Sequence, residues 1–324
     1  MDPLCHTLTG AALGEAGLKR RTALGLTTLM LAANLPDIDV AVFATDTLAV
    51  SFRRGWTHGV LALAVLPAVL AGLMAALDRL WRRRRSPDAP PADVRALVLL
   101  AYVGTLTHPF LDFLNSYGIR LLMPFSGRWF YGDALYIVDP WMYVLLGGGV
   151  WLARWRARRG FARPWQPARL GLALTAIYIA AMLGSNAWAR HTVHEGLARA
   201  GQGNARFMVT PVFADPFRRE VIVDTGERYE KGLLWFEPAP HFRPSGYGVE
   251  TNLASPMAAR AEQVPAVRAF LGWSRFPFFV AEPTAAGPRV RLNDYRYSDA
   301  TGETGWAGLT LEPSALPPAS GGEP

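Results

Sequence analysis

Long apolar runs dominate the first 190 residues of the chain, and shorter segments with turn residues between them follow. Four of these runs approach the roughly 20 residues with which a helix crosses a bilayer. Two shorter runs precede them, and each is long enough for a tilted or partly buried helix. The pattern predicts an α-helical integral membrane domain, in which a short N-terminal helical hairpin is followed by four long spans. The hairpin is expected at residues 4–17 and 22–35, and the spans at 58–81, 96–115, 136–155 and 170–189.

The character of the chain changes near residue 190. Short runs of β-branched and aromatic residues, separated by turns rich in Pro, Gly and Asp, predict a small antiparallel β-rich domain. We expect the membrane-embedded helical domain over residues 1–189 and the β-rich extramembrane domain over residues 190–312. The last segment, residues 313–324, is rich in Pro, Gly and Ser and is expected to be disordered. Strands are predicted at residues 207–213, 220–224, 232–236 and 289–293, and a short helix at 264–273.

Arginine clusters between the apolar runs predict how the helical domain crosses the membrane. Basic turns at residues 19–21, 82–85 and 154–159 account for most of the formal net charge of +7. Cytoplasmic loops of membrane proteins carry an excess of Arg and Lys, so all three turns are expected in the cytoplasm. The last span then leaves the β-rich domain on the outer side. Because the charge lies in short turns rather than on one basic face, we expect no nucleic-acid partner.

Cysteine usage limits the kinds of site that the chain can build. The single cysteine, Cys5, excludes an internal disulfide and a thiolate-rich zinc site. Any metal site must therefore use imidazole and carboxylate groups. The first apolar run is short, lacks a basic start and contains His6, so we expect no cleavable signal peptide.

The most informative stretch for chemistry is 105–118, where His108 and Asp112 interrupt an otherwise apolar run. Four residues apart on a helix, the two side chains lie on one face, one turn from each other. An imidazole and a carboxylate with that spacing can together bind a divalent metal ion. The alternative is a hydrogen-bonded acid–base pair that stabilises the core, and the pair by itself does not separate the two.

Other metal-competent side chains reach the same side of the membrane in the predicted topology. A Pro ends the second helix of the hairpin and presents two carboxylates, and a histidine begins the following span. Each could instead be an exposed histidine, a solvated turn or a helix cap. Imidazole and carboxylate ligands suit zinc, with manganese and non-haem iron as alternatives. The candidate ligands, enough for one ion or for two that share a carboxylate, are His6, Asp37, Asp39, His58, His108 and Asp112.

A phosphoester substrate would need anion-binding groups beside such a metal. The loop 124–133 offers Ser126 and Arg128 on the outer side of the membrane, and we expect these two residues to orient the phosphate. Arg53 and Arg54, which precede His58, could help. Contact with lipid headgroups is the alternative for these two arginines.

Five short motifs follow one another in the first 140 residues. They are Met-Asp-Pro-Leu-Cys-His-Thr-Leu-Thr-Gly at 1–10, Asn-Leu-Pro-Asp-Ile-Asp at 34–39, Arg-Gly-Trp-Thr-His-Gly at 54–59, Thr-His-Pro-Phe-Leu-Asp-Phe at 107–113, and Pro-Phe-Ser at 124–126 with Asp-Pro at 139–140. The series resembles the YdjM-like family of bacterial inner-membrane proteins, which are regarded as metal-dependent hydrolases. The match covers roughly the first 190 residues, and the C-terminal domain resembles the extension of longer members. The resemblance implies a multi-pass protein of the bacterial inner membrane with a periplasmic C-terminal domain.

A weaker similarity is to zinc-dependent phospholipase C and the related P1-type nucleases. In that fold an early His, an Asp, a later His and a His-x-x-x-Asp helix pair bind a zinc cluster. His6, Asp37 or Asp39, His58, and the pair His108 and Asp112 follow the same order here. Those enzymes use further histidines and a His-x-x-x-Glu pair downstream. We expect no pair of that spacing in residues 191–195, which follow the last span of this chain. We therefore do not expect a full three-zinc cluster.

Topology, ligand set and resemblance lead to one functional expectation. The protein is expected to be a membrane-bound metal-dependent hydrolase that uses metal-activated water on a phosphoester of a lipid or lipid-linked substrate. Asp37, Asp39, His58, His108 and Asp112 would hold the metal, and His6 would hold metal or act as acid or base. The alternative is a non-enzymatic membrane protein, whose metal or polar cluster ties helices together and whose outer domain binds a partner. A transporter fits less well, because a transport path needs polar groups through the full membrane thickness.

Overall fold

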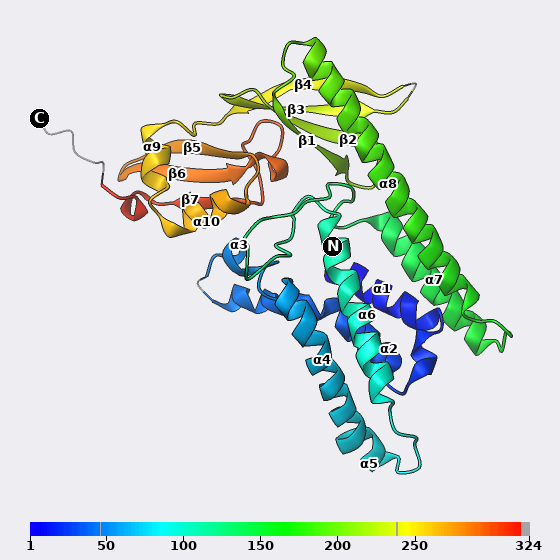
Figure 1. Ribbon diagram of the computed structural model, residues 1–324. Coiled ribbons are helices and arrows are strands. Elements are labelled where there is room, and N and C mark those ends of the chain that lie inside the picture. Colours follow the sequence, from blue (N-terminus) through cyan, green and yellow to red (C-terminus); the bar gives the residue numbers. More distant parts are fainter. Residues whose placement is uncertain (46, 238, 319–324) are drawn as a thin grey trace, which may run out of the picture. The chain divides into compact units, whose positions relative to one another are not determined.

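The computed structural model describes residues 1–45, 47–237 and 239–318, and the chain divides into two compact units (Figure 1). The helical unit contains most of the residues up to Ser185 together with Pro211–Asp215. The β-rich unit contains Thr47–Ser51 and most of the residues from Asn186 onward. The division therefore falls close to the boundary expected after residue 189. In the tail expected to be disordered, Pro313–Ala315 form a 3-10 turn, and residues 319–324 lie outside the described residues.

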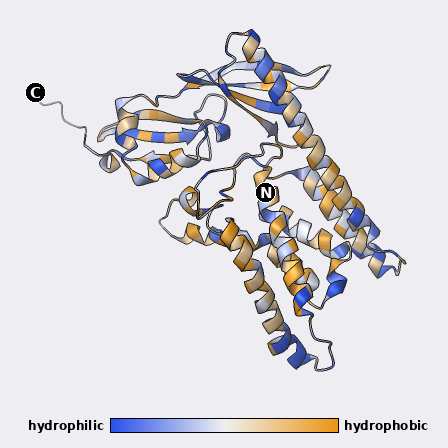
Figure 2. Ribbon diagram, viewed as in Figure 1, coloured by the Kyte–Doolittle hydropathy of each residue, from blue (hydrophilic) through white to orange (hydrophobic). Residues whose placement is uncertain are grey.

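The predicted fold class is confirmed. Within the described residues, four helices are long and apolar enough to cross a membrane, and two antiparallel sheets follow in the β-rich unit. The apolar colouring of these helices contrasts with the mixed colouring of the strands (Figure 2). The candidate spans are Gly25–Ala44, Val60–Arg85, Val94–Phe113 and Gln166–Arg199.

Three of these candidate spans coincide with expected ones, and the remaining one does not. The span expected at 136–155 forms helix α7 (Pro140–Arg158), whose last turns contain arginines that lower its hydropathy. In its place, α2 (Gly25–Asn34) of the hairpin continues beyond the predicted stop as the 3-10 helix η2 (Leu35–Ala44). Pro36 ends the α-helix, as expected, but its fixed φ angle is compatible with the first turn of the 3-10 helix.

Helix α2 packs between α1 (Pro3–Glu15) and α6 (Val94–Phe113), and two glycines allow the close approach. A Cβ on Gly10 of α1 would lie 2.6 Å from the Leu29 carbonyl oxygen, and one on Gly104 of α6 would lie 2.9 Å from the same atom. Small residues at such crossings let helix backbones touch, which is the main source of helix association inside a bilayer. These contacts bring α1 and α6 to either side of α2, which continues into η2.

Helix α4 (Val60–Leu77) is apolar on every side. Leu63, Leu70 and Met74 are buried against the neighbouring helices, whereas Val65, Val69 and Leu73 are exposed on the opposite side. Because a membrane span is apolar all round, the exposed side chains are those that face lipid. A π-helical turn (Asp78–Arg82) and the short helix α5 (Arg83–Arg85) end α4 in a basic turn.

The three basic turns lie together at one end of the helical unit, which we call the basic end. The first of them is the 3-10 helix η1 (Leu18–Arg21), and its neighbour Glu15 accepts a hydrogen bond at 3.0 Å from Arg154, near the end of α7. Thr22 Oγ1 accepts one from the backbone N–H of Asp93, in the loop that follows α5, at 2.8 Å. The polar colouring at these helix ends agrees with the contacts (Figure 2). Membrane proteins place such turns on one side of the bilayer.

Helix α6 leads away from the basic end to the predicted metal ligands. It begins after its N-cap Asp93, and His108 follows 14 residues after Val94, or about 20 Å along the helix. Helix α4 runs between the same two ends, because His58 precedes it and the arginines 82–85 end it. The candidate ligands on these elements therefore lie at the opposite end of the helical unit from the basic turns.

The β-rich unit contains two sheets with strand orders β1-β2-β3-β4 and β5-β6-β7. The C-terminal part of α8 (Gln166–Arg199) packs Ala189, Val193 and Leu197 against Val209 and Val221 of the first sheet. Strands β4, β5 and β7 and helix α9 were not among the predicted elements. The bounds are β1 (Arg206–Val212), β2 (Asp215–Asp224), β3 (Arg228–Trp235), β4 (His241–Glu250), α9 (Pro256–Ala261), α10 (Pro265–Trp273), β5 (Pro277–Thr284), β6 (Gly287–Asp294) and β7 (Gly308–Leu311).

Candidate metal centre

His108 and Asp112 occupy the last two turns of α6 and are both fully buried. Their spacing places them on one face, as predicted, with His108 Nε2 and Asp112 Oδ2 3.4 Å apart. The carbonyl oxygen of Ala33, near the end of α2, lies 2.7 Å from His108 Nδ1. A carbonyl oxygen can only accept, so Nδ1 carries the hydrogen and Nε2 presents its lone pair. The helix contact thus orients the ring for binding a cation.

His58 lies in the turn before α4, and neighbouring oxygen atoms hold its Nδ1 as the Ala33 carbonyl holds that of His108. Its Nδ1 lies 3.0 Å from Thr57 Oγ1 and 3.3 Å from Asp39 Oδ2. Thr57 itself donates to Asp39 Oδ2 at 3.1 Å, so its oxygen accepts from His58 Nδ1. The lone pair of His58 then lies on Nε2, which is 3.1 Å from His108 Nε2. Carboxylates and carbonyls that hold the second nitrogen of a histidine are characteristic of metal sites.

Two carboxylate oxygens complete a four-ligand cluster around these nitrogens. Asp112 Oδ2 lies 3.4 Å from the Nε2 atoms of both His58 and His108, and Asp37 Oδ1 lies 3.8 Å from both. Ligand atoms at the corners of a tetrahedron with metal bonds of about 2.0–2.1 Å are about 3.3–3.4 Å apart. Four ligand atoms that could hold one ion, all within 4.8 Å of one another, come from Asp37, His58, His108 and Asp112. Their number, type and spacing therefore fit a divalent metal ion.

Asp112 also shows an unsatisfied atom at this position. Among the described residues, its Oδ2 accepts no hydrogen bond, although the side chain is fully buried. The nearby cation is Arg54, whose Nε lies 3.2 Å from Oδ2. The rest of the Arg54 guanidinium donates to Asn115 Oδ1 at 3.1 Å and to the carbonyls of Gly118 and Met1. A buried carboxylate oxygen without a hydrogen bond is costly unless a cation binds to it.

Asp39 lies behind His58 rather than among the four ligand atoms. Its Oδ2 accepts from the backbone N–H of Arg54 at 2.8 Å as well as from Thr57, and its Oδ1 lies 3.3 Å from Arg53 Nε. Both oxygens are thus engaged by neighbouring donors. Sequence spacing had grouped Asp39 with Asp37 as a ligand, but in the 3-10 helix η2 the two carboxylates meet different partners.

His6 joins the cluster on the far side of Asp112. Its ring stacks on that of His108 with centroids 3.7 Å apart, and its Nε2 lies 3.3 Å from Asp112 Oδ1. The α-amino group of Met1 also contacts Asp112 Oδ1. Neither ring nitrogen of His6 forms a hydrogen bond in the part of the chain that the structure describes. Asp112 therefore contacts His58 and His108 through Oδ2 and His6 through Oδ1.

Ser126 and Arg128 do not join the cluster in the described structure. Ser126 Oγ accepts a hydrogen bond from Arg128 N at 3.3 Å, and the exposed Arg128 guanidinium lies over the ring of Phe130. Arg53 lies at the cluster instead, with one guanidinium nitrogen 3.4 Å from Asp37 Oδ1. Sequence reasoning assigned supporting roles to Arg53 and Arg54, but it did not find Thr57, Ala33 or Asn115. Thr57 lies within the motif at 54–59 and Asn115 within the stretch 105–118, but the contacts of all three residues depend on tertiary packing.

A His-x-x-x-Glu pair does occur downstream, which corrects the expectation from the weaker resemblance. His191 Nε2 lies 3.2 Å from Glu195 Oε1 on α8, in the part of that helix that belongs to the β-rich unit. Both side chains are more than half exposed. Such a solvated pair on one helix turn is common, and it offers two ligands only.

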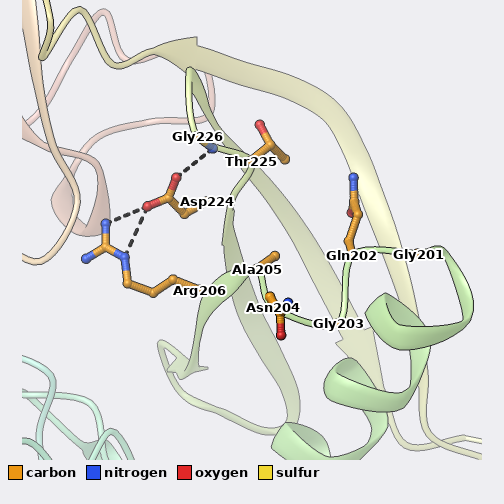
Figure 3. Close-up of a pocket in the computed structure, with 9 residues that line it drawn as sticks. All are labelled: Gly201, Gln202, Gly203, Asn204, Ala205, Arg206, Asp224, Thr225 and Gly226. Carbon is orange, nitrogen blue, oxygen red and sulfur yellow. Dashed lines mark hydrogen bonds and ion pairs between the residues drawn. The ribbon is translucent and has the colours of Figure 1, made fainter.

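The β-rich unit also contains a hollow of about 470 Å³, formed by residues 201–206 and 224–226 (Figure 3). Its two charged side chains bind each other, with Arg206 nitrogens 2.7 and 3.1 Å from Asp224 Oδ2. Asp224 Oδ1 accepts from Gly226 N, and Arg206 also donates to the carbonyl of Arg275. Because these charges are already paired, we assign the hollow no catalytic role.

Two comparisons match this chain to known proteins. The chain is 24% identical over 164 residues to the uncharacterized protein YfhP of Bacillus subtilis (strain 168), and the aligned part covers 47% of each protein. The chain thus matches about half the length of that relative. No solved structure matches. A family model described as YdjM inner membrane protein matches residues 1–191, which include the whole cluster and the helices that hold it. The chain therefore belongs to the YdjM family of inner membrane proteins.

Proposed function

We propose that this membrane protein is a metal-dependent hydrolase whose metal ligands are Asp37, His58, His108 and Asp112. The observation that carries the proposal is that two imidazole lone pairs and two carboxylate oxygens converge, while the other nitrogen of each ring is held by an acceptor. Zinc suits two imidazoles and two carboxylates, and manganese or iron are alternatives. A divalent ion in such a site supplies water activation at neutral pH and polarisation of a phosphoryl or acyl oxygen.

The surroundings of Asp37 support a lipid or lipid-linked substrate. Its side chain is 12% exposed, whereas those of His58, His108 and Asp112 are fully buried, so the cluster opens on the side of Asp37. Large apolar side chains exposed near it are Ile38, Val40, Phe43 and Trp56. In a membrane protein these side chains can contact acyl chains, while a phosphoester in the headgroup reaches the ligands.

Arg53 is the group that we propose binds the substrate phosphate. Its side chain is 22% exposed at the opening, it lies over the ring of Phe43, and it contacts both Asp37 and Asp39. A planar guanidinium can exchange such long carboxylate contacts for a bidentate contact with phosphate. We therefore propose Arg53 in the role first expected of Ser126 and Arg128. Arg54 is saturated by protein acceptors and fixes Asp112.

His6 has two possible roles in this proposal. It could hold a second ion together with Asp112 Oδ1, or it could donate and accept a proton near the substrate. The metal content of His6→Ala separates them. A second ion predicts that wild-type protein binds about two ions per chain and the variant about one, whereas an acid–base role leaves the metal content unchanged.

The orientation of the protein is also a proposal. If the basic end faces the cytoplasm, the metal centre lies at the outer surface of the membrane. The span α8 begins beside the basic turn and leads into the β-rich unit, which is then periplasmic. A cysteine placed in the β-rich unit of a variant with Cys5→Ser should react with a membrane-impermeant thiol reagent in whole spheroplasts.

The direct test is elemental analysis of the detergent-purified protein, followed by assays with phospholipid and lipid-phosphate substrates. His108→Ala should remove the bound metal and the hydrolysis together. Arg53→Gln should keep the metal and raise KM more than it lowers kcat. The matched control is Arg128→Gln, an arginine with no contact to the cluster, which should keep both properties. Normal hydrolysis by His108→Ala would exclude the proposed catalytic role.

A non-enzymatic role is the competing proposal, because the cluster ties together α1, η2, the turn before α4 and the end of α6. It predicts metal binding without turnover of any phosphoester by the wild-type protein. In that case His108→Ala would lower the thermal stability alone, and the β-rich unit would be the part that binds a partner.

A further inference from the structure

The basic end contains two guanidinium groups on one indole ring. Arg20 of η1 places its Cζ 4.4 Å from the centroid of Trp165, and Arg169 in the first turn of α8 places its Cζ 5.9 Å from the same centroid. Arg169 Nε also donates to the carbonyl of Ala16 at 2.9 Å, which fixes this side chain against the end of α1. Residues about 145 positions apart in the sequence thus form one cationic group.

The charges of this pair are not neutralised by the protein. Within residues 1–45, 47–237 and 239–318, neither Arg20 nor Arg169 forms an ion pair with a carboxylate. The nearby acid, Glu15, is already bound by Lys19 Nζ at 2.5 Å and by Arg154 Nε at 3.0 Å. Two like charges on one ring repel each other, and a bound anion would reduce that repulsion.

The position of the pair identifies the kind of anion. Trp165 lies directly before α8, which is a candidate membrane span. Arg20 lies in η1, five residues before the span that begins at Gly25. Trp155, in the last turn of α7, contacts Arg159, and Phe161, in the loop that follows, contacts Arg156. Tryptophans and arginines at the ends of spans lie at the level of the lipid headgroups. Basic groups between helices at that level bind anionic phospholipids.

We propose that Arg20, Trp165 and Arg169 form a binding site for the phosphate of an anionic phospholipid in the leaflet at the basic end. The two guanidinium groups bind the phosphate oxygens, and the indole keeps both groups in place. This site lies at the opposite end of the helical unit from the metal centre, and it does not depend on the proposed hydrolase activity.

The test measures lipid retained by the full-length protein in native mass spectra after exchange into mixed micelles. The micelles contain phosphatidylglycerol or phosphatidylcholine, and a third sample adds inorganic phosphate. We expect the wild-type protein to retain phosphatidylglycerol preferentially. Inorganic phosphate at about 10 mM should not displace it, because a lipid is held at the membrane surface beside the basic groups. Arg20→Gln with Arg169→Gln should weaken retention at least about tenfold, as loss of two charge-assisted contacts implies.

The matched control is Arg83→Gln with Arg84→Gln, which removes the same charge at the same end without touching Trp165. It should retain phosphatidylglycerol as the wild type does. The single change Arg20→Gln keeps the contact of Arg169 with Ala16 and should weaken retention by a smaller factor, which guards against misfolding of the double variant. Equal loss in the control pair would indicate general charge attraction. Such an equal loss would overturn the proposal. Equal retention of phosphatidylcholine, or displacement of phosphatidylglycerol by phosphate, would overturn it as well.

Discussion

The two units of this protein each bury an aspartate completely, and they treat it in opposite ways. In the β-rich unit, Asp294 Oδ1 accepts from Arg296 N at 2.9 Å. Its Oδ2 accepts from Ser274 Oγ at 2.6 Å, from Arg275 N at 3.2 Å and from an Arg296 guanidinium nitrogen at 2.7 Å. In the helical unit, Asp112 Oδ2 accepts no hydrogen bond within the described residues. It lies 3.2 Å from Arg54 Nε and 3.4 Å from two histidine nitrogens that carry lone pairs.

The difference teaches how to separate a structural buried charge from a functional one. Asp294 and Arg296 form a closed pair in which each oxygen has donors, so nothing further is needed for stability. The four-ligand cluster is closed only when a cation lies between its members, because lone pairs and carboxylate oxygens repel one another. Burial alone therefore does not mark a site. A buried group indicates a site when one of its polar atoms has no hydrogen bond.

Matched substitutions in the two units should produce the largest contrast. Asp112→Asn removes one metal ligand and should reduce bound metal to near zero, as measured by elemental analysis. Asp294→Asn leaves Arg296 buried without its partner and should lower the stability of the β-rich unit by about 3–5 kcal/mol. That loss would be measured by Trp fluorescence during urea unfolding, with the metal content unchanged. Loss of metal in Asp294→Asn would contradict the comparison.

A smaller effect is expected for the carboxylate behind His58. Asp39→Asn keeps the side-chain volume but weakens the hold on His58 Nδ1, so metal affinity should fall about 10- to 100-fold rather than disappear. Competition with a chromophoric chelator measures this change. Asp37→Asn serves as the reference, because it removes a ligand and should abolish binding at the same metal concentration. If Asp39→Asn is as severe as Asp37→Asn, Asp39 is a ligand, as sequence spacing first suggested.

The smallest effect concerns the response of the β-rich unit to acid. Burial by itself would raise the pKa of Asp294, but the Arg296 guanidinium and the hydrogen bonds from Arg296 and Ser274 hold that pKa below its ordinary value. A lowered pKa in the folded state contributes stability that is complete above the unfolded pKa of about 3.9 and is lost as pH falls toward the folded pKa. The free energy of unfolding should therefore fall below about pH 4 in the wild type.

The control for this pH dependence is Asp294→Asn, in which the fall below pH 4 should be shallower. Glu250→Gln, which removes an exposed partner of Arg228, should leave the slope of the wild type unchanged, because exposed ion pairs contribute little. Parallel slopes in the wild type and in Asp294→Asn would show that Asp294 does not contribute to acid sensitivity.

Local sequence signals predicted the helices well and the strands in part. The apolar run of α4 and the apolar run of α6 indicate spans whatever lies beside them, because crossing a bilayer depends on length and hydropathy. Strands β4 and β5 contain Pro and Gly within or beside them and form because neighbouring strands provide hydrogen bonds. Each neighbouring strand lies elsewhere in the chain, so a local sequence pattern does not reveal β4 or β5.

Composition and spacing by themselves determined that this protein has membrane-spanning helices, that the basic turns group together, and that His108 and Asp112 share a helix face. These properties depend on residues close in sequence or on total hydropathy. Only the tertiary structure decided that Asp37 joins His108 and Asp112 while Asp39 supports His58. It also decided that Arg53 rather than Arg128 contacts Asp37. Those distinctions depend on the direction in which each side chain points and on contacts between segments far apart in the sequence. A local sequence pattern contains no information about either.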